Sequence, residues 1–141
     1  MKNKWLFGLP VLTLILCLSL AYCQELTEKE KQVFYEVVEW EMESAADMSD
    51  EEAEDAARGI AAKHGISYEQ LQDVMTRGYN MPLTAQEEKV ADEIKKRLSA
   101  CGEYPETDIL VKVCSEAAAK YRMPTGQAVS TYFRKYPNVP D

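Results

Sequence analysis

The chain has 141 residues, 46% of them hydrophobic and 28% charged, which is enough apolar material for one small folded core. Its 24 acidic residues outnumber its 16 basic ones and give a net charge of −8. A surface that binds nucleic-acid phosphates needs clustered lysine and arginine, so this composition argues against nucleic acid as a partner.

The first residues have the pattern of an export signal. Lys2 and Lys4 precede an apolar stretch of about 15 residues that ends near Ala21. Pro10 interrupts this stretch, which is shorter than the roughly 20 apolar residues that a membrane span needs. We therefore expect residues 1–23 to be a cleaved signal peptide and the mature protein to be exported, either periplasmic or secreted.

Cys23 leaves open how this signal is processed. Residues 20–23, Leu-Ala-Tyr-Cys, resemble a bacterial lipoprotein box, in which Cys23 would be acylated and would anchor the protein to a membrane. Tyr22 fits that box poorly, because a small residue is expected just before the cysteine. Plain secretion is the preferred interpretation, and lipidation of Cys23 is the alternative.

The rest of the chain contains the same pattern twice. Residues 26–79 align without a gap on residues 83–136 at an offset of 57, with eleven identities among 54 pairs. Chance would give roughly three identities at ordinary residue frequencies. The alignment predicts an internal duplication, with unit one at residues 24–79, unit two at residues 80–136 and a short tail at residues 137–141.

Each unit has the apolar spacing of three helices, so we predict an all-α protein of six helices. The first helix of each unit opens with a capping box, in which Thr27 or Thr84 is followed three residues later by a glutamate. The four other helices are expected to begin near Ser49, Ser67, Thr107 and Pro124.

The second and third helices of unit one resemble a helix-turn-helix motif. The residues with its spacing are Ala61, Gly65, Leu71 and Val74. The resemblance would imply a recognition helix at residues 67–79, but Arg77 is the only cation there. We therefore interpret the motif as two short helices packed at a steep angle, an orthogonal arrangement, and exclude DNA binding.

Two cysteines, Cys101 and Cys114, lie outside the predicted signal peptide. In an oxidising compartment they would most simply form one disulfide, worth about 3 kcal/mol for a loop of this length. A structural zinc site would need four ligands, and a redox pair normally has two residues between its cysteines. The sequence therefore favours a Cys101–Cys114 disulfide.

Catalytic patterns are missing from the sequence. His64 is its only histidine, and the aligned residue in unit two is Tyr121, which favours a packed ring over a catalytic base. The acidic run at residues 47–55 lacks the glycine of a calcium-binding loop. Phosphate-loop and hydrolase motifs are also missing. We therefore expect no metal, no cofactor and no enzymatic activity.

Two functional hypotheses lead, and a small hydrolase that uses the abundant acids is a third alternative for which the sequence offers no candidate residue. The first is a non-enzymatic protein-interaction module of the cell envelope, which binds another envelope or secreted protein. The acidic first half of the mature chain would suit a basic partner. The second is a carrier that holds a small apolar ligand or lipid between the two units. For either hypothesis the candidate surface lies at the unit ends and the joint between them, at Tyr79, Met81, Leu83 and Tyr136. A membrane is expected as a partner only through a lipid anchor on Cys23.

Overall fold

A computed structural model describes residues 25–44, 47–102 and 106–137. The predicted signal peptide with Cys23, and residues 138–141 of the predicted tail, lie outside the described residues.

The described residues form six helices and no strand, which confirms the predicted all-α class. The helices are α1 (Glu28–Ser44), α2 (Asp50–Lys63), α3 (Tyr68–Tyr79), α4 (Ala85–Ala100), α5 (Thr107–Tyr121) and α6 (Thr125–Lys135).

Four of the six helices begin with a reciprocal capping box. At α1 the Thr27 hydroxyl accepts from the Glu30 N–H at 3.2 Å, and the Glu30 carboxylate accepts from the Thr27 N–H at 2.8 Å. Thr84 and Glu87 form the same pair of bonds at α4, and α2 and α3 begin with equivalent boxes. These bonds satisfy backbone donors that the first turn of a helix leaves without partners, so each sequence signal fixes a helix start.

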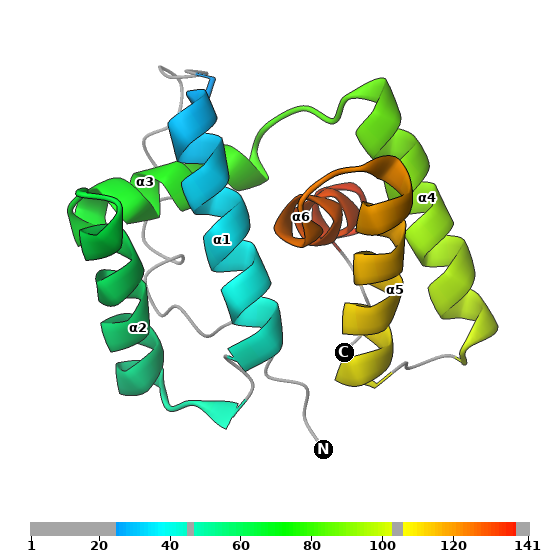
Figure 1. The fold of residues 1–141 in the computed structure, drawn as a ribbon, viewed down its shortest axis with the longest axis horizontal. Coiled ribbons are helices and arrows are strands. Elements are labelled where there is room, and N and C mark those ends of the chain that lie inside the picture. Colours follow the sequence, from blue (N-terminus) through cyan, green and yellow to red (C-terminus); the bar gives the residue numbers. More distant parts are fainter. Residues whose placement is uncertain (1–24, 45–46, 103–105, 138–141) are drawn as a thin grey trace.

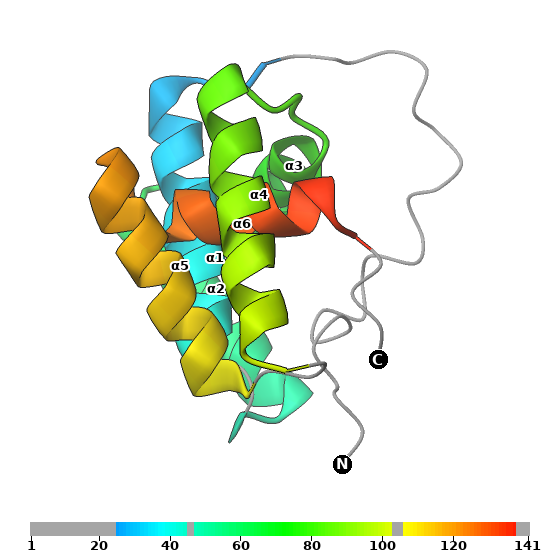
Figure 2. The same ribbon diagram turned by 90° about the vertical axis from the view of Figure 1, so that its right-hand side faces the viewer.

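The helices lie in two groups that follow the chain. Figure 1 shows α1, α2 and α3 in one half of the molecule and α4, α5 and α6 in the other. In Figure 2, α6 runs across the directions of α4 and α5. Helix α6 packs against α4, α5 and α1, so it joins the two groups into one continuous hydrophobic core.

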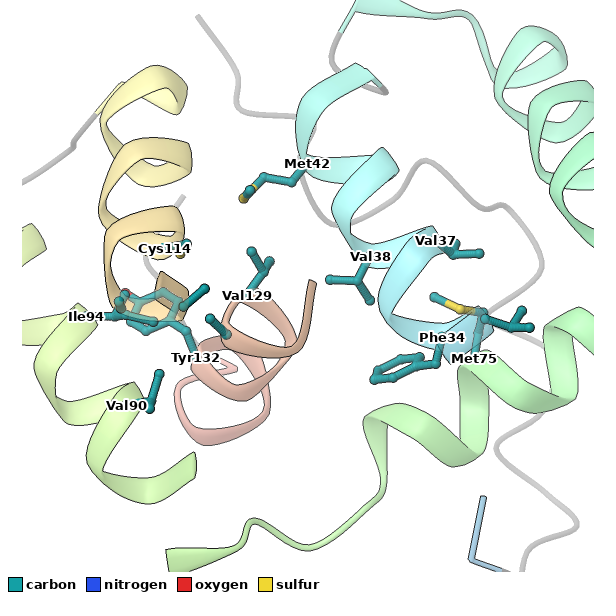
Figure 3. Packing of buried hydrophobic residues seen from close by; sticks show 14 of the residues in the cluster. Phe34, Val37, Val38, Met42, Met75, Val90, Ile94, Cys114, Val129 and Tyr132 are labelled. Atoms are coloured by element: carbon teal, nitrogen blue, oxygen red, sulfur yellow. The ribbon is translucent and has the colours of Figure 1, made fainter. Parts of the chain in front are cut away.

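Helix α1 is buried on two sides. On one side Phe34 and Val37 face Met75 of α3, and on the other Val38 and Met42 are directed toward Val129 of α6 (Figure 3). A helix with apolar residues on two opposite faces can pack against a neighbouring helix on each face. Helix α1 is therefore the element that both halves of the core share.

A glycine makes the contact between α1 and α6 possible. A Cβ atom at Gly126, in the first turn of α6, would overlap the carbonyl oxygen of Tyr35 on α1. Because the obstacle is backbone, no side-chain movement could relieve the overlap. Gly126 therefore permits an approach of the two helices that a side chain would prevent.

The turn between the second and third helices has the same form in both units. Gly65 has φ of 69° and Arg122 has φ of 55°, both in the left-handed region. In each turn the next residue, Ile66 or Met123, donates a backbone hydrogen bond of 3.0 Å across the end of the helix. This is a Schellman ending. Arg122 adopts it although glycine is the residue that favours it.

Candidate functional site

The predicted Cys101–Cys114 disulfide is not formed in the structure, where both residues are free thiols. Cys101 is exposed at the end of α4, and its thiol donates to the Arg97 carbonyl at 3.3 Å. Cys114 is fully buried on α5, and burial raises its pKa to about 12. A core thiol and an exposed helix end have opposite environments, which spacing along the chain does not reveal.

The structure ties the two candidate tyrosines to separate neighbours. The Tyr79 ring packs edge-on against Phe34, with centroids 5.1 Å apart. The Tyr136 ring lies 5.6 Å from that of Tyr132, and its hydroxyl donates to Asp92 at 2.5 Å. Among the described residues, no aromatic contact joins Tyr79 to Tyr136.

Met81 and Leu83, the other two candidates, are partly buried in the segment between α3 and α4. The Met81 carbonyl accepts a hydrogen bond of 3.3 Å from Arg134 of α6. The segment between the units is therefore held against the last helix through its backbone.

The molecule has an open hollow of about 550 Å³ on its α4–α5 side. Its lining is almost entirely charged and consists of Asp92, Glu93, Lys96, Arg97, Ala100 and Lys120. The hollow is open to solvent and is not at the joint between the units, so it does not enclose a ligand there.

His64 lies beside a carboxylate at the end of α2. Its Nε2 atom is 2.8 Å from Glu36 of α1, and Lys63 pairs with the other oxygen of the same carboxylate at 2.6 Å. No nucleophile completes this group among the described hydrogen bonds of His64. The group serves to fasten α2 to α1.

The aligned residues of unit two make the same arrangement without a histidine. The Tyr121 hydroxyl donates to Glu93 at 2.8 Å, and Lys120 donates to it at 2.8 Å. The bonds from Lys120 and Tyr121, with Arg97, lower the pKa of Glu93 to about 2. Because tyrosine replaces histidine while the bond remains, the shared role is structural.

The most buried of the described ion pairs is one that the sequence analysis did not single out. Arg134 of α6 lies 2.9 Å from Glu87 of α4, with side chains 3% and 5% exposed. Burial raises the pKa of Glu87, but bonds from the Thr84 N–H, the Gln127 amide and Arg134 outweigh it, and the net pKa is lowered. The charged pair is thus held ionised inside the protein.

The aligned pair in unit one, Arg77 and Glu30, has the same contact at 2.6 Å but is 17% and 30% exposed. The Arg77 bond and the Thr27 N–H lower the pKa of Glu30 to about 2. All four residues were among the identities of the alignment, so the opposite charges at matching positions were a usable signal.

Glu41 is a partly buried carboxyl group on α1. It aligns with Leu98 of unit two, which is 5% exposed. Burial raises the pKa of Glu41 to about 7, although the Tyr79 hydroxyl partly offsets this by hydrogen bonding to the carboxyl group. The alignment could have revealed the position, because it pairs an acid with a core leucine.

Charge is distributed very unevenly between the two units. Residues 25–80 carry 15 acidic and 5 basic residues, a net charge of −10. Residues 81–137 carry 8 acidic and 9 basic residues, a net charge of +1. The field of the molecule is therefore negative over unit one and close to neutral over unit two.

The acidic surface is concentrated where α1 ends and α2 begins. Glu43, Asp47, Asp50 and Glu51 are exposed there, and none forms an ion pair with another described residue. Helices α2 to α6 each carry a lysine or arginine in the last turn, whereas α1 has Glu41 and Glu43 there. Acids at a helix C-terminus oppose the helix dipole, typically at a cost of about 0.3–1 kcal/mol each.

Within the described residues, no three His, Cys, Asp or Glu side chains are grouped so that they could hold a metal ion. None of the six helices has the length and apolar character needed to cross a bilayer. The fold and these sites define a small all-helical protein. No family model matches the chain, and no match is found among curated proteins or solved structures.

Proposed function

We propose that the chain is an exported, non-enzymatic protein-interaction module of the cell envelope, built from a duplicated three-helix unit. The duplication is supported by the helix starts: α4, α5 and α6 begin 57 residues after α1, α2 and α3. It is also supported by two matching ion-pair groups and a matching turn at positions related by the same offset. Export rests on the signal pattern of residues 1–23.

The partner we propose is a protein with a basic surface, which docks where α1 ends and α2 begins. The observation that carries this proposal is the last turn of α1, the one helix of the six that ends in acids without a base. A protein that keeps an arrangement unfavourable to its own stability commonly does so at a functional site. Opposite charge on the partner would offset the cost and speed the encounter.

The described surface gives this mode of binding more support than an apolar one. Met48, 39% exposed, is the only large hydrophobic residue classed as exposed among the described residues, and it lies within the acidic region. An interface built on a large apolar patch would need many more such residues. The hollow on α4–α5 is open and is not at the joint between the units, so it gives the ligand-carrier hypothesis no support.

The experiment is a co-purification from the native envelope with three forms of the protein. One form is wild type, and a second carries Glu43→Gln, Asp47→Asn and Glu51→Gln. A matched control neutralises three acids of unit two with Glu106→Gln, Asp108→Asn and Glu116→Gln.

We expect one basic protein to be retained in fixed ratio by the wild type and by the unit-two control, and to be lost from the variant in unit one. Retention should fall steeply as salt is raised, because exposed charges are screened. Equal retention by both variants, or a wild type that elutes alone at physiological salt, would contradict the proposal.

A further inference from the structure

The two units meet through one face of α1 and one face of α6. On α1 this face carries Val38 and Met42, 2% and 4% exposed, with the backbone of Tyr35 beside them. On α6 it carries Gly126, which approaches Tyr35, and Val129, which is 1% exposed (Figure 3). We name these the receiving face and the docking face.

Unit two has its own copy of the receiving face, and that copy is polar. The residues of α4 aligned with Tyr35, Val38 and Met42 are Asp92, Lys95 and Ser99, all exposed. They are occupied by contacts within unit two: Tyr136 donates to Asp92, and Lys95 lies 4.1 Å from the centre of the Tyr136 ring.

Unit one has a copy of the docking face on α3, which is also polar. The residues aligned with Gly126, Val129 and Ser130 are Glu69, Gln72 and Asp73. Ser130 is fully buried against its neighbours, whereas Glu69 and Asp73 are exposed. A glutamate in place of Gly126 would also prevent the backbone approach that the contact requires.

We infer that the contact between α1 and α6 is a directional interface of the repeated unit, and that polar residues close it at both free ends. A receiving face pairs with a docking face and not with itself, so identical units would add head to tail without limit. Asp92 and Lys95 on one end, and Glu69 and Asp73 on the other, stop this addition, because an added unit would have to remove these charges from water. The structure is thus a closed array of two units, and the chain is a monomer.

This inference rests on the duplication proposed above, but it makes no use of the basic partner. Its first test is the mass of the purified wild-type protein in solution, measured by sedimentation equilibrium over a hundredfold range of concentration. We expect a monomer throughout. Self-association would overturn the inference and would leave the proposal of a basic partner untouched.

The second test converts one free end at a time. One variant copies the receiving face onto α4 with Asp92→Tyr, Lys95→Val and Ser99→Met. The other copies the docking face onto α3 with Glu69→Gly, Gln72→Val and Asp73→Ser. Circular dichroism and cooperative melting establish that each is folded.

Each variant should remain monomeric alone and with wild type, and an equimolar mixture of the two should form a 1:1 dimer. A mixture of folded variants that stays monomeric would overturn the inference, because it would mean that the aligned faces are not equivalent. A variant that forms dimers alone would overturn the directional pairing. If either variant fails to fold, the mass of the wild type still decides whether the array is closed.

Discussion

At the scale of single residues, the protein contains the same arginine–glutamate interaction in two environments, one buried and one partly exposed. The side chains of Arg134 and Glu87 are only 3% and 5% exposed. Burial and the charge of Glu87 raise the pKa of Tyr35 on α1. Arg77 and Glu30 form the same contact but reach solvent, and Arg77 also pairs with Asp73 at 2.8 Å. Replacing one partner of an ion pair destabilises the protein most when the remaining charge is buried away from water. The same arginine substitution should therefore cost more stability in the buried pair than in the exposed one.

We predict that Arg134→Met lowers the free energy of unfolding by about 3–5 kcal/mol, because Glu87 would remain as a buried charge without its partner. Arg77→Met should cost about 1 kcal/mol or less, because Glu30 can be hydrated. Urea unfolding of the two variants measures both values. Equal losses would show that the burial of Arg134 has no energetic consequence.

Glu41 should give the protein an unusual pH dependence. Its pKa is about 7 in the folded protein against 4.5 ordinarily, so the folded state binds more protons between these values. Stability should therefore fall as pH rises from 4.5 to 7, by about 3 kcal/mol at most. The lowered pKa values of Glu30 and Glu93 act in the opposite direction and reduce stability as pH falls below 4.5 toward 2.

The measurement is the unfolding free energy at pH 5 and at pH 8 for wild type, Glu41→Gln and Glu41→Leu. Both variants should lose the decline that Glu41 causes over this range. Glu41→Leu, which copies Leu98 of unit two, should also be the more stable form at pH 8. A decline of the same size in all three proteins would refute the assignment to Glu41.

At the scale of helices, α6 can lie close to α1 because Gly126 has no side chain. Two of the glycines that lie in helices have very different surroundings: a Cβ atom at Gly126 would meet the Tyr35 backbone, whereas one at Gly59 of α2 would have nothing within 4 Å. The same substitution at these positions therefore separates packing from helix propensity.

We predict that Gly126→Ala lowers the free energy of unfolding by more than about 2 kcal/mol, because α6 must move away from α1. Gly59→Ala should raise it by about 0.5–1 kcal/mol, because alanine favours the helix and meets no obstacle. Thermal and urea unfolding of both variants provide the comparison. A harmless Gly126→Ala would mean that the two helices are farther apart than described.

The helices themselves could be predicted because their signals are local. Thr84 and Glu87 fix the start of α4 from four consecutive positions, and apolar spacing identifies the buried faces. The pairing of α1 with α6 could not be predicted in this way. It depends on a glycine at position 126 meeting a backbone some 90 residues earlier, and no periodicity records that contact.

In the candidate site, too, some features could be predicted from the sequence and others could not. Cys101 and Cys114 are free thiols, one exposed and one buried, and the spacing of two cysteines along the sequence does not reveal their burial. Glu41 and Arg134 could have been identified from the sequence, because the alignment at offset 57 pairs Glu41 with Leu98 and Arg134 with Arg77. What the alignment lacked was the burial that distinguishes Arg134 from Arg77.

At the scale of the whole molecule, two units of similar design divide two tasks. Unit one carries a net charge of −10 and provides the acidic surface proposed for the partner, whereas unit two, at +1, provides the helix that closes the core. The single hydrophobic cluster extends through both units by way of α1 and α6. Because they share this cluster, we expect the two units to fold and unfold together.

This coupling can be measured by urea unfolding of the mature protein with a separate probe in each unit. Trp40, the only tryptophan outside the predicted signal peptide, reports on unit one by fluorescence, and the amide resonance of Ala117 on α5 reports on unit two. We expect one shared midpoint, which Gly126→Ala lowers equally for both probes. Two separate transitions, or a shift confined to one probe, would contradict it.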